Sequence, residues 1–152
     1  MLRQQLNGAL KDAMKAKEER ATSTLRLILA ALKDRDIANR TAGVDDTEIG
    51  DDQILQLLQS MIKQRRDSIE AFQKGGRQEL ADAEALEIEI IQRFLPEQMD
   101  ENAVSDAVIQ TIAEVGASSI KDMGNVMGLL RNKYAGRMDF GKASTMVKDR
   151  LG

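Results

Sequence analysis

Apolar residues recur at every third or fourth position over most of the chain. In one example, Leu25, Ile28, Leu29 and Leu32 follow this spacing while charged residues fill the positions around them. Such a period places the apolar side chains on one face of an α-helix. No segment is predicted to form a strand. The pattern therefore predicts an all-α protein.

Four of the predicted helices precede Pro96. Gly75 and Gly76 are expected to end the third helix, because a left-handed turn is cheap only for glycine. Pro96 ends the fourth, since proline disfavours the helical conformation of the preceding residue and lacks an N–H. The predicted helices run over about 2–17, 22–40, 51–74 and 78–95, with N-caps at Thr22 or Ser23 and at Asp51.

Three shorter amphipathic helices are predicted after Pro96, which we take as a domain boundary. The expected N-caps are Asp100 for the first, Ser118 or Ser119 for the second and Asp139 for the third. The predicted organisation is an N-terminal helical domain of about four helices, residues 1–96, and a C-terminal three-helix domain, residues 97–152.

The chain contains no cysteine and no histidine. This removes the thiolate nucleophile, the commonest general base and the imidazole metal ligands. A Ser–Lys pair at Ser118, Ser119 and Lys121 is conceivable, but serines before an amphipathic helix are usually caps. We therefore predict a protein without catalytic residues, cofactor or metal.

Two groups of acidic residues offer carboxylates for a chemical site. The acidic loop lacks the ligand spacing of a calcium loop, so a solvated loop with an N-cap is the preferred interpretation. Its acids are Asp45, Asp46, Glu48, Asp51 and Asp52. Glu84, Glu87 and Glu89 supply carboxylates, but their spacing is typical of the wet side of a helix.

Composition also bears on the compartment. The missing cysteines, and first residues without the apolar core of a signal peptide, lead us to expect a cytoplasmic protein. The longest apolar run is far shorter than the roughly 20 residues that a bilayer requires, so no membrane association is expected.

The net charge of −3 argues against a protein that coats nucleic acid over its whole surface. The C-terminal part is nevertheless uneven. Residues 97–116 hold five acids and no cation, whereas residues 117–152 hold seven cations and three acids. This separation predicts one acidic and one basic face.

The most informative local feature is the pair Gly124 and Gly128, because glycine inside a helix costs roughly 1 kcal/mol relative to alanine. One explanation is close helix packing within the lobe. The other is a ligand backbone, such as a sugar–phosphate chain, that approaches the same strip. Nearby residues that could position phosphates are Lys121, Asn125, Arg131, Lys133, Gly136, Arg137 and Lys142.

Several segments resemble the GatB/YqeY family. In the C-terminal part these are Asp122–Gly128, Lys133–Arg137 and Val147–Leu151. The segments 25–33, 63–70 and 94–98 are similar to the stand-alone, YqeY-like branch, so the resemblance covers nearly the whole chain.

The resemblance implies a C-terminal lobe similar to the tail of the B subunit of glutamine-dependent aminoacyl-tRNA amidotransferase, where the tail contacts tRNA. Any label of carbon–nitrogen ligase activity with glutamine as amido donor would describe that larger enzyme. Asn125 stands where a lysine is common in the family. The positions that carry over as tRNA-facing are Gly124, Gly128, Lys133, Gly136 and Arg137.

Three functional hypotheses follow. The first is a non-catalytic tRNA-binding accessory module. The second is a protein–protein adaptor that docks a partner of the translation machinery, for which the fourth helix offers a wide apolar stripe at Leu80, Ala83, Leu86, Ile90 and Phe94. The third is participation in amide transfer itself.

Overall fold

A computed structural model describes residues 1–43 and 48–152. Within these residues the chain forms seven α-helices and one short 3₁₀ helix, and no strand. The all-α prediction is confirmed. Contacts group the chain into two compact units, Met1–Leu95 and Pro96–Gly152. This division lies one residue from the predicted boundary between 1–96 and 97–152. That the two units are separate domains stays a prediction.

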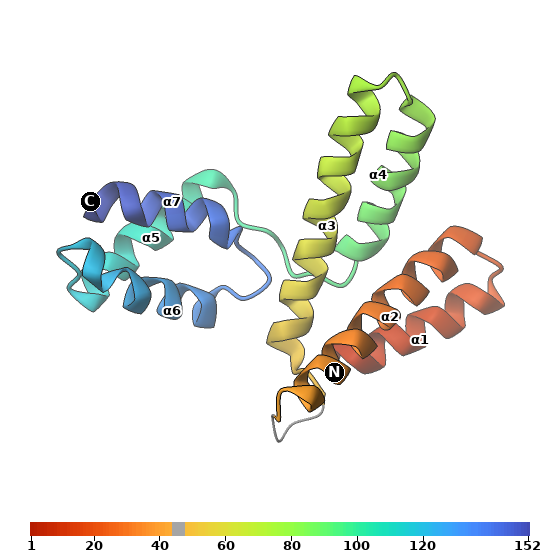
Figure 1. The fold of residues 1–152 in the computed structure, drawn as a ribbon, viewed down its shortest axis with the longest axis horizontal. Coiled ribbons are helices and arrows are strands. Elements are labelled where there is room, and N and C mark those ends of the chain that lie inside the picture. The colour runs from red at the N-terminus through yellow and green to blue at the C-terminus, as the bar shows by residue number, and fades with distance from the viewer. Residues whose placement is uncertain (44–47) are drawn as a thin grey trace. The chain divides into compact units, whose positions relative to one another are not determined.

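The first unit consists of two helical hairpins (Figure 1). Helix α1 (Leu2–Lys15) packs against α2 (Glu19–Thr41), and α3 (Asp51–Lys74) packs against α4 (Gln78–Gln92). Each helix turns its apolar face inward, so that one core joins all four. Its most buried large side chains are Leu6, Ile28, Leu32, Ile54, Leu58 and Ile91.

Helix starts in this unit differ from the prediction. Helix α2 begins at Glu19, so that Thr22 lies inside it and its hydroxyl donates to the Glu18 carbonyl (2.8 Å). The link from α1 is only three residues long, so α2 starts before Thr22 and Ser23 are reached. Asp51 is the first helical residue of α3 rather than its cap.

Two helix ends behave differently. Helix α3 ends at Lys74, and Gly76 adopts a φ of +71°, which confirms the predicted glycine stop. Helix α4 ends at Gln92, earlier than the predicted 95. Phe94 and Leu95 still donate to carbonyls three residues back, so the last turn before Pro96 is tighter than an α-helix.

A polar clamp joins the start of α1 to the end of α2. Both terminal nitrogens of Arg3 donate to the carboxylate of Asp36 (2.9 and 3.0 Å). The backbone N–H of Ile49 donates to the same carboxylate (2.9 Å). Burial by itself would raise the pKa of Asp36, but these hydrogen bonds and the attraction of Arg3 together lower it.

The second unit is a bundle of three α-helices that all pack on one another (Figure 1). It contains α5 (Glu101–Val115), the 3₁₀ helix η1 (Ile120–Asp122), α6 (Met123–Lys133) and α7 (Phe140–Leu151). The predicted caps are confirmed, because Asp100 accepts from Ala103 and Asp139 accepts from Gly141 and Lys142. The core contains Val108, Val126, Leu130, Met138 and Val147.

Two of the acidic residues considered for a calcium loop lie near cations, and the described helices lack membrane-spanning character. Asp45 and Asp46 lie outside the described residues, while Glu48 lies 3.9 Å from Arg3 and Asp51 lies 3.6 Å from the N-terminal amine. Among the helices that the structure describes, none combines the length and the apolar character that crossing a bilayer would need.

Candidate nucleic-acid interface

The glycines of α6 share one side of the helix with a cation, and a second cation precedes them. Gly124, Gly128 and Arg131 are separated by four and three residues within α6, a spacing that places them on one side of it, and Lys121 of η1 precedes Gly124 by three residues. Asn125 flanks these residues. All five are exposed except Gly128, which is half-buried. We call these five residues the α6 strip.

The strip is open above both glycines. A Cβ atom built on Gly124 or on Gly128 meets no atom within 4 Å other than the local helix backbone. Both keep ordinary helical backbone angles, so neither is needed for a left-handed turn. The explanation by close helix packing is therefore wrong for the described residues. None of them occupies the space that a side chain at Gly124 or Gly128 would fill.

The two cations of the strip are not paired with acidic side chains of the described residues. Within the described part of the chain, neither Lys121 nor Arg131 forms an ion pair. The nearest acid in sequence, Asp122, accepts the backbone N–H groups of Ser118 and Ser119 (3.0 and 3.3 Å). The Asp122 carboxylate is thus occupied by hydrogen bonds at the N-terminus of the helix.

Lys133 does not belong to the strip. It lies nine residues after Gly124, which corresponds to half a turn around the helix and places it on the opposite side. There its ammonium forms an ion pair with Glu114 of α5 (2.7 Å). The hydrogen bond to Glu114 raises the pKa of Lys133. This ion pair connects the acidic segment 97–116 to the basic segment 117–152.

Gly136 and Arg137 hold the start of the unit. Gly136 is buried, has a φ of +77°, and accepts a hydrogen bond from the Gln98 side chain. The Arg137 carbonyl accepts from the N–H of Met99 (2.9 Å), and its guanidinium donates to the carbonyl of Glu97 (3.2 Å). Both residues thus have structural contacts, and their tRNA-facing role stays a prediction.

Replacing Gly136 by alanine is expected to destabilise the second unit by about 1–2 kcal/mol, because a side chain at this φ meets steric strain. Thermal unfolding followed by circular dichroism measures the change. Gly124→Ala is the matched control, since it adds the same methyl group to open space and should raise stability by up to about 1 kcal/mol. Equal effects at the two positions would contradict this assignment.

Lys142 and Ile120 are also exposed in this unit. Lys142 lies exposed in the first turn of α7, where its backbone N–H donates to the cap Asp139 (3.2 Å). Ile120 is not among the predicted contact residues, and it is 47% exposed. It precedes Gly124 by four residues, so its spacing was the available signal that it lies at the head of the strip.

Ser119, Glu84 and Glu87, which were considered for catalysis, have structural partners. Ser119 and Asp122 form a capping box at the start of η1, which supports the interpretation of the serine as a cap. Glu87 pairs with Arg65 of α3 (2.9 Å), and Glu84 lies 4.0 Å from the same guanidinium. These contacts join α3 to α4.

Comparison with known proteins gives several fungal relatives. "Altered inheritance of mitochondria protein 41, mitochondrial" of Eremothecium gossypii is 35% identical over 90 residues, 59% of this chain and 46% of that protein. Its namesake in Lachancea thermotolerans is 37% identical over the same shares. An uncharacterized protein of Schizosaccharomyces pombe is 33% identical over 88 residues, 58% of this chain and 67% of that protein. The chain spans about half the length of the first two.

The expectation of a purely cytoplasmic protein is wrong on this comparison, because the relatives called altered inheritance of mitochondria protein 41 carry a mitochondrial designation. Its basis was too weak. Missing cysteine argues only about disulfide chemistry, and does not distinguish the cytoplasm from another compartment in which thiols stay reduced.

The family comparison covers almost the entire chain. The family model of the Yqey-like proteins matches residues 3–151, which include both units and the whole α6 strip. This agrees with the resemblance seen in the sequence. The chain therefore belongs to the YqeY-like protein family, which supports its relationship to the tail of the amidotransferase B subunit.

Proposed function

We propose that the chain is a non-catalytic tRNA-binding accessory module, and that the α6 strip is its contact surface. The observation that carries the proposal is the pair of open glycines between two cations that form no ion pair with any described residue. A helix that lacks side chains along one line lets a sugar–phosphate backbone approach closely, and Lys121 and Arg131 then contact phosphates at either end.

An RNA ligand fits the chemistry of the strip better than base readout in DNA. Recognition by shape and phosphate contacts is typical for structured RNA, whose deep major groove is closed to side chains. The strip has no aromatic residue on which unpaired bases could stack. The relationship to the amidotransferase tail supports tRNA as the class of RNA.

The other two hypotheses stay predictions without an observation that favours them. The apolar stripe proposed for an adaptor is largely used inside the first unit, since Ile90 is buried and only Leu80 and Leu86 are clearly exposed. For amide transfer, Glu87 serves an ion pair with Arg65 and Ser119 serves a capping box.

The test is binding of the full chain to bulk tRNA across a salt series, with duplex DNA as control. Two phosphate contacts predict a slope of log affinity against log salt of about −2, because each contact releases nearly one counterion. We expect selective binding to tRNA. Equal binding to DNA, or no binding to tRNA at low salt, would contradict the proposal.

A further inference from the structure

Two asparagines lie beside the glycines of α6. Asn125 and Asn132 are both exposed and are seven residues apart, which places them on one side of the helix, about 10 Å from each other along its axis. Gly128 lies between them, three residues after the first and four before the second. Asn132 thus continues the edge of the α6 strip that begins at Asn125. We call these two residues the α6 amides.

The α6 amides have no partner within the part of the chain that the structure describes. Neither side chain forms a hydrogen bond there. Asn7 of α1 shows the internal alternative, because its amide donates to the carbonyl of Arg3 four residues back (3.0 Å). Asparagine is a poor helix former, so two of them lower the stability of an eleven-residue helix that already contains two glycines.

The chemistry of an amide side chain matches that of a ribose hydroxyl. The amide offers both a hydrogen-bond donor and an acceptor. The 2′-hydroxyl of RNA does both as well, and it is the group that distinguishes RNA from DNA. Phosphate oxygens only accept, and Lys121 and Arg131 supply donors for them. The surface around the strip thus combines donors for phosphates with amides suited to ribose.

The spacing of the two cations indicates a part of the RNA. Lys121 and Arg131 are ten residues apart, which corresponds to roughly 15 Å along the helix. The minor groove of double-helical RNA is wide and shallow, and it displays 2′-hydroxyls between the two phosphate backbones. A helix without protruding side chains can lie on such a groove with one cation at each rim. The minor groove of B-DNA, about 6 Å wide, is narrower than an α-helix of about 10 Å.

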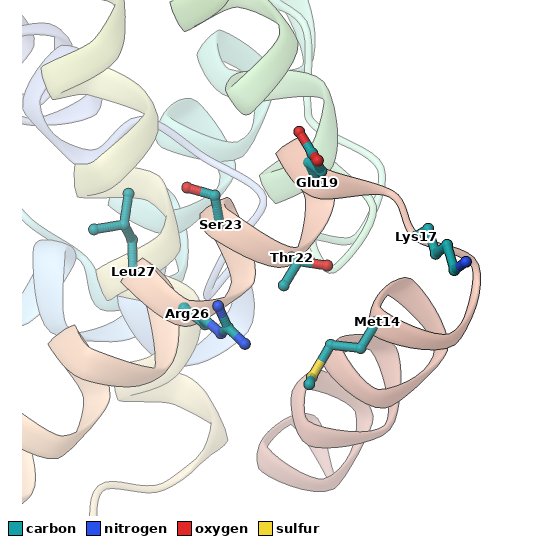
Figure 2. Close-up of a pocket in the computed structure, with 7 residues that line it drawn as sticks. All are labelled: Met14, Lys17, Glu19, Thr22, Ser23, Arg26 and Leu27. Carbon is teal, nitrogen blue, oxygen red and sulfur yellow. The ribbon is translucent and has the colours of Figure 1, made fainter.

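A pocket in the first unit shows that two neighbouring cations alone do not make such a surface. Its lining includes Lys17 and Arg26, together with the side chains of Met14 and Leu27 (Figure 2). Both aliphatic side chains are about half exposed, at 50% and 48%. They stand where the α6 strip has bare backbone, so this pocket serves as a comparison surface.

We infer that α6 binds across the minor groove of a double-helical RNA segment, with the α6 amides hydrogen-bonded to 2′-hydroxyl groups. This contact rests on the proposed function and specifies the part of the RNA that is bound. Phosphate contacts position the ligand, whereas contacts to the 2′-hydroxyl distinguish RNA from DNA. Asn125 and Asn132 are therefore specificity-determining residues.

Three duplexes of one sequence test this contact: RNA, the same RNA carrying 2′-O-methyl groups, and DNA. Fluorescence anisotropy with the full chain at one low salt concentration measures the affinities. The 2′-O-methyl duplex keeps the RNA-type double helix, but its ribose no longer donates a hydrogen bond. The full chain is expected to bind unmodified RNA about tenfold more tightly than either of the other two duplexes.

Asn125→Leu with Asn132→Leu removes both amides, keeps side chains of similar size and favours the helix. This variant should bind the RNA duplex about tenfold less tightly and no longer distinguish the three probes. Asn102→Leu with Gln110→Leu is the matched control, because it removes two exposed amides from α5. This control and Lys17→Glu with Arg26→Glu, at the comparison surface, should both keep the preference for RNA.

The outcomes separate this contact from tRNA binding itself. If the parent chain binds tRNA but binds the three duplexes equally, or if the leucine variant of α6 keeps the preference for RNA, the minor-groove contact is overturned while the proposed function stands. If the parent chain binds no tRNA, both are overturned.

Discussion

Reversing both cations of the α6 strip, Lys121→Glu with Arg131→Glu, is expected to lower tRNA affinity about 10- to 100-fold. Each substitution removes a phosphate contact and adds a repelling carboxylate. The salt dependence should weaken too, by about two units of slope if the two residues supply the phosphate contacts. Fluorescence anisotropy with labelled tRNA at several salt concentrations measures both quantities.

The matched control is Lys148→Glu with Arg150→Glu, which makes the same change in net charge. These residues lie exposed in the last turn of α7, away from the strip in sequence. If net charge alone governed binding, the two variants would lose affinity equally, and the assignment to the strip would fail. Circular dichroism establishes that both variants remain folded.

Replacing Asp36 by alanine is expected to reduce the stability of the first unit by about 2–3 kcal/mol. The carboxylate is 14% exposed and serves both Arg3 and the backbone N–H of Ile49. Its removal leaves a partly buried guanidinium and an N–H group without their acceptor. Denaturant unfolding measures the loss, and Asp34→Ala, at an exposed position on the same helix, should change stability much less.

The same clamp predicts acid sensitivity. The pKa of Asp36 lies below its ordinary value of 3.8 in the folded chain. Its contribution to stability is therefore complete above that value and is lost as the pH falls from there through the folded pKa. Unfolding free energies measured from pH 7 downward should fall less steeply for Asp36→Asn than for the parent. Parallel curves would contradict the role of the clamp.

Local signals in the sequence predicted most helix boundaries in the second unit. Asp100 and Asp139 are caps because each is followed by N–H groups that its carboxylate can reach, a property of a few consecutive residues. The first unit differed at Thr22 and Asp51. There the start of a helix depends on short links and on packing against other helices, which local propensity does not record.

The candidate site shows the same distinction. Gly124 and Gly128 could be singled out from the sequence because glycine is unfavourable inside any helix. The position of Lys133 on the opposite side followed from the helical period and could also have been predicted. Its pairing with Glu114, nineteen residues away, and the buried turn at Gly136 depend on how the three helices pack.

The most direct test of the central claim is the tRNA affinity of Gly124→Gln with Gly128→Gln. Glutamine is uncharged and favours helices, so the variant should be at least as stable as the parent while its side chains cover the strip. The account predicts an affinity about tenfold lower, since a backbone can no longer approach the helix closely. An undiminished affinity in this stable variant would contradict the assignment of the α6 strip as the contact surface.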